Sequence, residues 1–253
     1  MYSAVEQSAR TRPGELRDHM VGAVTGATLE RDPFCHIYME RIFPATFYQL
    51  MLSNLPSPND YVPLNLRLYS RKNGESTRDL FHLTADNLAK LSQQAAGIWA
   101  DVVRAATHPL FKRAVFAKLA PDLAERFGIH ESQVPDMDCA YEVILFRDTD
   151  DYRIKPHPDG LNKIVTMQFY LPEDESIVDL GTSLYRSSNG LLGRSFHELK
   201  RFPFKPNSAY AFAVSDSRIR KSWHGRDRLT AFSGVRNTLM VLFQQKSPRE
   251  YRI

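Results

Sequence analysis

The second half of the chain is a succession of short apolar segments that no helical period interrupts. These segments are rich in β-branched and aromatic residues, and each is about as long as an average β-strand. Turn-forming residues separate them, as in the connection 187–190. Parallel strands need long crossover connections, usually helices, so the lack of helical segments here favours an antiparallel sandwich or barrel. The expected strands are 141–146, 164–171, 181–185, 208–214 and 237–244.

The first half of the chain carries helical patterns instead. Between Thr84 and Ala106, apolar residues recur at steps of three and four, which places them on one face of a helix. Thr84 is the expected N-cap of this helix. Two shorter helical patterns follow at 110–119 and 121–127, and Gly128 stands where a helix C-terminus favours glycine. The first half is therefore expected to be mainly helical.

The first 30 or so residues show no sustained hydrophobic period, and Pro13 and Gly14 interrupt them. We expect a loosely ordered arm there. The remaining patterns predict an α+β protein in which helices buttress a jelly-roll core. Residues 1–135 would form a mainly helical part that packs on the core. Residues 136–253 would form the core itself, and both parts would belong to one compact domain.

Composition excludes several classes of protein. With 43% hydrophobic and 25% charged residues, the 253-residue chain has a globular composition. The longest apolar segments fall far short of the roughly 20 residues that cross a bilayer, and the first 20 residues lack the apolar stretch of a secretory signal. We therefore expect a cytoplasmic protein with no membrane partner. The net charge, 33 − 29 = +4, is too small to indicate a nucleic-acid partner. Cys35 and Cys139 form no C-x-x-C pair and are expected to be buried thiols.

Two histidines and an aspartate have the spacing of a metal site. His157 and Asp159 stand two residues apart between two expected strands, so their side chains project the same way. His224 follows His157 by 67 positions, the length of several antiparallel strands with their turns. Two imidazoles and one carboxylate bind one face of a divalent metal and leave three positions open, as in non-haem Fe(II) oxygenases. Taken alone, an H-x-D is more often a surface turn, and a single histidine is usually structural.

The residues that follow extend this pattern. Arg236 stands twelve positions after His224, and Thr238 follows two residues later at the start of the last expected strand. An H-x-D, a distal His and an Arg-x-Thr in this order resemble the 2-oxoglutarate and Fe(II)-dependent dioxygenase superfamily, which includes prolyl-hydroxylase-like members. The resemblance covers about residues 141–244. In the first half of the chain, only the general helical character agrees with the family. It implies that the jelly roll is a double-stranded β-helix.

The resemblance also implies a cofactor set and residue roles. Fe(II), 2-oxoglutarate and O2 are the implied cofactors, and the implied metal ligands and catalytic residues are His157, Asp159 and His224. Arg236 would donate two parallel hydrogen bonds to the far carboxylate of 2-oxoglutarate, and Thr238 would donate one more. Lys163 is a competing anchor, because some members of the superfamily hold this carboxylate from a lysine on that strand.

Candidate substrate contacts are less specific. Arg67 lies on an alternating stretch before the long helix, which is either a sheet-extending strand with substrate contacts or simple surface. Trp223 and Arg228 flank His224. A basic cluster surrounds the same histidine. It is either a solvated loop face or the entrance of the site, where it would attract anions such as 2-oxoglutarate or a carboxylated or phosphorylated substrate. The cluster consists of Arg218, Arg220, Lys221, Arg226 and Arg228.

The function that these patterns indicate is an Fe(II)/2-oxoglutarate-dependent oxygenase. It would hydroxylate a small polar or anionic metabolite, with release of succinate and CO2. Asp159 argues against halogenation, because halogenating relatives lack this carboxylate, whereas desaturation and cyclisation stay open. One alternative is a prolyl-type hydroxylase of protein side chains, and another is a non-catalytic, cupin-like binding protein. The sequence specifies neither the substrate nor the oligomeric state.

Overall fold

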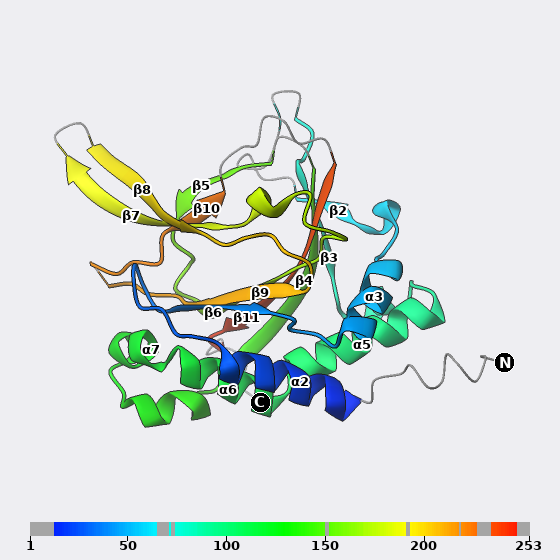
Figure 1. Ribbon diagram of the computed structural model, residues 1–253, viewed down its shortest axis with the longest axis horizontal. Coiled ribbons are helices and arrows are strands. Elements are labelled where there is room, and N and C mark those ends of the chain that lie inside the picture. The colour runs from blue at the N-terminus through cyan, green and yellow to red at the C-terminus, as the bar shows by residue number, and fades with distance from the viewer. Residues whose placement is uncertain are drawn as a thin grey trace.

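Two β-sheets face each other, and helices cover the outer face of the larger one (Figure 1). The computed structural model describes residues 13–64, 71, 74–149, 152–190, 193–217, 219–226 and 234–246. Within these residues the strands of the larger sheet are β1 (His36–Glu40), β2 (Val62–Pro63), β3 (Arg78–His82), β4 (Ala140–Thr149), β6 (Lys163–Tyr170), β9 (Ser208–Ala213) and β11 (Val235–Gln244). Those of the smaller sheet are β5 (Ile154–His157), β7 (Ser183–Gly190), β8 (Gly193–Arg201) and β10 (His224–Arg226).

Neighbouring strands are antiparallel in both sheets. The order is β1-β9-β6-β11-β4-β3-β2 in the larger sheet and β5-β10-β7-β8 in the smaller one. From β4 onward the chain passes repeatedly between the two sheets, so strands that are distant in sequence become neighbours. This is the topology of a jelly roll, and the expected α+β jelly-roll class is confirmed.

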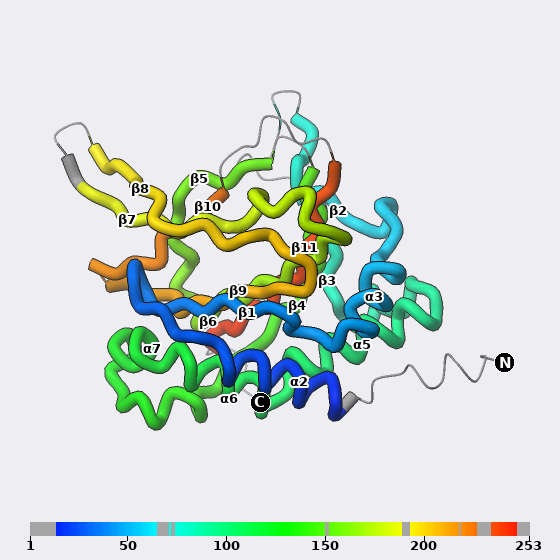
Figure 2. Tube along the Cα trace, in the orientation of Figure 1, coloured from blue at the N-terminus to red at the C-terminus, as the bar shows by residue number. Residues whose placement is uncertain are grey.

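The helices lie on the side of the larger sheet that faces away from the smaller sheet (Figure 2). Their apolar side chains and the outer face of the sheet form one core cluster, in which the ring of Phe116 lies 5.4 Å from that of Phe243. Both cysteines are buried free thiols, as expected. No described helix is long and apolar enough to cross a membrane. The described α-helices are α2 (Pro13–Gly26), α3 (Ala45–Ser53), α4 (Ala85–Leu88), α5 (Gln93–Ala106), α6 (Pro109–Lys118) and α7 (Ala120–Phe127).

The expectation of a loosely ordered arm is wrong for residues 13–26, which form α2, while residues 1–12 lie outside the described residues. Pro13 is the first residue of the helix, where a backbone N–H has no intrahelical partner and proline is favoured. Leu16, Met20 and Val24 follow at steps of four and are fully buried against the sheet. This apolar stripe was the helical signal, and the proline marked its start.

The single helix expected between Thr84 and Ala106 is in fact two helices. Thr84 caps the first, as expected, because its hydroxyl accepts a hydrogen bond from the backbone N–H of Asn87. The helix ends at Leu88, and Ser92 then caps α5 by accepting from Ala95. A serine hydroxyl offers the backbone an alternative to helical hydrogen bonds, and here it starts a new helix.

The other expected helices and strands form, with two differences. The helices expected at 110–119 and 121–127 are α6 and α7, and Gly128 ends α7 in the left-handed conformation with φ of 64°. The five expected strands all form and overlap β4, β6, β7, β9 and β11. The connection expected at 187–190 instead belongs to β7. The first half also contributes β1, β2 and β3 to the larger sheet, at positions for which no strand had been expected.

Candidate functional site

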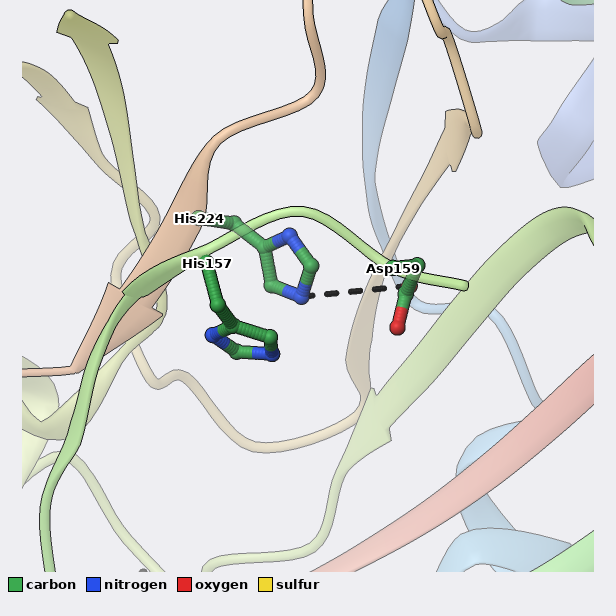
Figure 3. A group of neighbouring side chains, drawn as sticks. All are labelled: His157, Asp159 and His224. Atoms are coloured by element: carbon green, nitrogen blue, oxygen red, sulfur yellow. Dashed lines mark ion pairs between the residues drawn. The ribbon is translucent and has the colours of Figure 1, made fainter. Parts of the chain in front are cut away.

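His157, Asp159 and His224 come together between the two sheets (Figure 3). His157 ends β5 and His224 begins β10, and the two residues are direct partners in the antiparallel pairing of these strands. Their ring centroids are 4.4 Å apart. Asp159 lies two residues beyond β5, and one potential ligand atom from each of the three residues falls within 4.8 Å of the others. The structure therefore brings together the three residues that the sequence singled out.

Hydrogen bonds orient both imidazoles in the same way. Nδ1 of His157 lies 2.9 Å from the carbonyl oxygen of Lys155, and Nδ1 of His224 lies 3.0 Å from that of Ser222. A carbonyl oxygen only accepts, so each Nδ1 carries the proton and donates it. Each Nε2 consequently keeps its lone pair and is the nitrogen available to a metal.

Two side chains fix the carboxylate of Asp159. Lys163 Nζ donates to Oδ1 over 2.5 Å, and the hydroxyl of Thr166 donates to Oδ2 over 2.6 Å. Oδ2 also lies 3.9 Å from Nε2 of His224. Partners of this kind orient metal ligands and support their affinity. Thr166 was not expected from the sequence, although its position on β6, close to Asp159 in the chain, was a usable signal.

The electrostatics of the three residues favour the protonation states that bind a metal. Burial acts to raise the pKa of Asp159, but His224, Lys163 and Thr166 outweigh it and hold this pKa at about 2. Burial, with the neighbouring His224, lowers the pKa of His157 to about 4. Burial also lowers the pKa of His224. At neutral pH the site therefore holds one carboxylate and two neutral imidazoles, the forms that bind divalent metals.

A cavity of about 160 Å³ opens at these residues between the two sheets. Hydrophobic side chains such as Ile144 and Leu242 contribute to its walls. Cationic side chains also line it, so an anion entering the cavity meets positive charge from both sheets. Among the described residues, the cationic side chains that line the cavity are Arg78, Lys163, Arg226 and Arg236.

Arg236, the expected carboxylate anchor, lines this cavity from β11 and is 1% exposed. Its Nε donates to the carbonyl of Leu180 over 2.8 Å, and one terminal nitrogen donates to Asp148 over 2.9 Å. The other terminal nitrogen lies 3.4 Å from Oε1 of Gln168. These contacts use three of five guanidinium hydrogens. Thr238, its expected helper, is fully buried and accepts from Gln168 over 3.2 Å.

Asp148 joins Arg236 to a third strand. The register aligns Arg78, Asp148 and Arg236 across β3, β4 and β11. Arg78 donates to both oxygens of Asp148, over 2.6 and 3.0 Å. Burial acts to raise the pKa of Asp148, but the two arginines keep it below its ordinary value. The sequence did not reveal this network, because it depends on the register of three strands.

The other candidate residues have different positions. Lys163 contacts Asp159 rather than standing free as an anchor. Trp223 packs against Phe196 of β8, with ring centroids 4.8 Å apart, and is not among the residues that line the cavity. Arg67 and Arg228 lie outside the described residues, as does Arg218. Of the basic cluster around His224, Arg226 is the member that reaches the cavity within the described part of the chain.

Arg226 is buried in this wall and keeps its charge. Burial, with the nearby Arg236, lowers the pKa of Arg226 to about 10, so the guanidinium is protonated at neutral pH. The sequence contained a signal for this position. Arg226 stands two residues after His224, and residues two apart on a strand share a face.

Comparison with known proteins identifies the fold of the chain. No family model and no curated protein matches the chain. A prolyl hydroxylase from Trichoplax adhaerens, solved with a hypoxia-inducible factor peptide fragment, matches with 8% identity, a TM-score of 0.52, and coverage of 100% of this chain and 98% of its own. The non-haem α-ketoglutarate-dependent epimerase SnoN of nogalamycin biosynthesis matches with 11% identity, a TM-score of 0.50, and coverage of 92% and 84%. The chain therefore has the fold of the 2-oxoglutarate and Fe(II)-dependent oxygenase superfamily, the double-stranded β-helix.

Proposed function

We propose that the protein is an Fe(II)/2-oxoglutarate-dependent oxygenase. The observation that carries this proposal is the convergence of His157, Asp159 and His224, which bring one potential ligand atom each to within 4.8 Å of the others beside a cationic cavity. Two imidazoles and one carboxylate suit Fe(II) and leave coordination positions for other ligands. The protonation states at neutral pH fit the same metal.

The residues of the chain have separate roles in this proposal. His157, Asp159 and His224 hold Fe(II), which when bound would supply the oxidising chemistry that converts 2-oxoglutarate and O2 to succinate and CO2 and hydroxylates the substrate. Lys163 and Thr166 keep the carboxylate of Asp159 ionised and oriented.

The cavity wall would position the cosubstrate. Arg236 orients 2-oxoglutarate through the guanidinium hydrogens that its neighbours leave unused, and Thr238 supports it through Gln168. The apolar part of the wall, which includes Ile144 and Leu242, excludes water from the reacting groups.

The proposed substrate is a small polar or anionic metabolite. The cationic lining of a small cavity supports it, because such a cavity attracts and selects anions. A hydroxylase of protein side chains is a second candidate, because the fold match includes a prolyl hydroxylase solved with a peptide. Substrate-stimulated succinate formation separates the two when metabolites and proline-containing peptides are assayed side by side.

Anaerobic titration of the apoprotein with Fe(II) and then 2-oxoglutarate tests the reaction class. We expect the weak visible charge-transfer band of an Fe(II)–2-oxoglutarate complex, which His224→Ala should abolish because a ligand is lost. A wild-type protein that binds both without this band, or binds neither, would favour the cupin-like binding protein instead.

A further inference from the structure

The side chain of Arg226 occupies an unusual position beside the candidate metal ligands. It lies two residues after His224 on β10, so both side chains project from the same face of the strand. Both also line the cavity. Arg226 is only 5% exposed, which is rare for a residue that carries a full charge.

The hydrogen bonding of Arg226 is incomplete within the described part of the chain. One terminal nitrogen donates to the carbonyl of Tyr152 over 2.7 Å, and the guanidinium lies 4.7 Å from the centroid of the Tyr152 ring. Its Nε and its other terminal nitrogen are buried and have no partner there. Burying charged donors without partners is costly, so such donors in native proteins usually have an acceptor, which a bound water, ion or ligand can supply.

The nearby carboxylate of Asp148 attracts this charge, but its hydrogen bonds go to other residues. Asp148 accepts from Arg78 with both oxygens and from Arg236 with one. Three arginines therefore lie around the carboxylate of Asp148, and the one whose guanidinium makes no hydrogen bond to it among the described residues is Arg226.

We propose that Arg226 binds a carboxylate group that enters this cavity. A carboxylate offers only acceptors, which are what Nε and the terminal nitrogen lack. Arg226 is the arginine of this group whose guanidinium makes no contact with Asp148 among the described residues, so a single entering carboxylate would give it a counter-ion.

Two molecules can supply this carboxylate, and here the inference rests on the proposed function. One is 2-oxoglutarate itself, and the other is the organic substrate. The charges favour the substrate, because the metal and Arg236 already provide for the two carboxylates of 2-oxoglutarate. Arg226 would then select substrates that carry a carboxylate of their own.

The first experiment needs neither metal nor 2-oxoglutarate. Thermal unfolding of the metal-free protein is followed in sodium acetate and in sodium chloride of equal ionic strength, because a bound ligand raises the Tm. Arg226→Met is compared with Arg153→Met, since Arg153 is exposed and does not line the cavity. Acetate should raise the Tm of the wild type and of Arg153→Met, and clearly less that of Arg226→Met. An equal rise in all three proteins, or no rise in the wild type, overturns the proposal.

A second variant covers the case in which Arg226→Met does not fold. Arg226→Gln removes the charge but keeps an amide that can donate to the carbonyl of Tyr152. The same loss of the acetate effect is expected, and a retained effect overturns the proposal.

The second experiment identifies the source of the carboxylate. Calorimetric titration measures 2-oxoglutarate binding to the Mn(II)-loaded wild type and Arg226→Met, and the acetate comparison is repeated on protein saturated with both. If Arg226→Met binds 2-oxoglutarate as tightly as the wild type, and acetate still raises the Tm of the saturated wild type but not of the variant, the carboxylate belongs to the organic substrate. An affinity at least about 30-fold weaker in Arg226→Met assigns it to 2-oxoglutarate and overturns the substrate assignment. If the wild type binds neither Mn(II) nor 2-oxoglutarate but keeps the acetate effect, the proposed function fails while the carboxylate site stands.

Discussion

Lys163 donates a hydrogen bond from Nζ to Oδ1 of Asp159 over 2.5 Å. The residue that competes with Arg236 as an anchor for 2-oxoglutarate is therefore already paired with a candidate metal ligand. Arg236 is paired as well, with Asp148, but it retains two guanidinium hydrogens and a place in the cavity wall. The two residues consequently differ in what their removal should change.

Arg236→Leu should weaken 2-oxoglutarate binding with little effect on the affinity for Mn(II). Loss of one partner of a buried charged contact costs on the order of 2–5 kcal/mol, or roughly 30-fold to several-thousand-fold in affinity. Lys163→Met should show the reverse pattern, because it releases the carboxylate of Asp159. Calorimetric titrations with Mn(II) and then with 2-oxoglutarate measure both quantities. A large loss of 2-oxoglutarate affinity in Lys163→Met alone would make Lys163 the anchor.

Each of His157→Ala, Asp159→Ala and His224→Ala should lose Mn(II) binding and turnover while the fold is retained. Each removes one of three converging ligand atoms. His197→Ala is the matched control, because His197 is exposed on β8 and does not line the cavity. Mn(II) binding is measured by calorimetry, and circular dichroism verifies the fold. Near-normal metal affinity in His224→Ala would contradict the assignment of the site.

The metal-free protein should lose stability as the pH falls from about 6.5 to about 4. The pKa of His157 is about 4 in the folded state, against about 6.5 in the unfolded chain. As the pH falls, His157 is therefore protonated in the unfolded chain before it is protonated in the folded protein. The contribution of neutral His157 to the free energy of unfolding is complete above about pH 6.5 and is lost as the pH falls to about 4.

Through His157, the free energy of unfolding should fall by about 2 kcal/mol over this interval, after allowance for the partial exposure of the imidazole. Urea unfolding with EDTA at several pH values measures it. In His157→Gln the free energy of unfolding should change less over this interval, and an identical pH dependence in both proteins would show that His157 titrates normally.

Gly225→Ala should weaken Mn(II) binding without a change in any ligand. A Cβ at Gly225 would lie 2.6 Å from the carbonyl oxygen of Ile154 on β5, which is closer than real contacts allow. Strands β5 and β10 would have to separate, and they carry His157 and His224. Gly22→Ala is the control, because nothing lies within 4 Å of a Cβ there. Equal Mn(II) affinities in the two variants would show that the strand contact does not determine the metal geometry.

Asp148→Asn should destabilise the protein by about 3–5 kcal/mol, because it leaves Arg78 and Arg236 buried without their shared counter-ion. Asp138→Asn is the matched control. Asp138 pairs with Lys246 but its side chain is 77% exposed, so its loss should change the free energy of unfolding by no more than about 0.5 kcal/mol. Urea unfolding compares both variants with the wild type.

The parts of the fold and site that local patterns encode were predictable from the sequence. Strands such as β6 and β11 have strong β propensity, and the H-x-D with a distal histidine identified all three converging residues. The pairing of Asp148 with Arg78 was not predictable, because 70 residues separate them and only the strand register joins them. Helix α2 was missed for a different reason, since Pro13 was interpreted as a breaker although it begins the helix.

The three residues of β10 also constrain where oxidation would take place. Two positions along a strand span roughly 6.6 Å. Gly225, the residue between His224 and Arg226, lies so close to β5 that a Cβ there would be 2.6 Å from the carbonyl oxygen of Ile154. For a substrate held by its carboxylate at Arg226, the strand backbone would fix the distance between that carboxylate and a metal held by His224. The attacked carbon would then be set by its count of bonds from the carboxylate, and a homologue longer by one methylene would be oxidised at a different carbon along its chain.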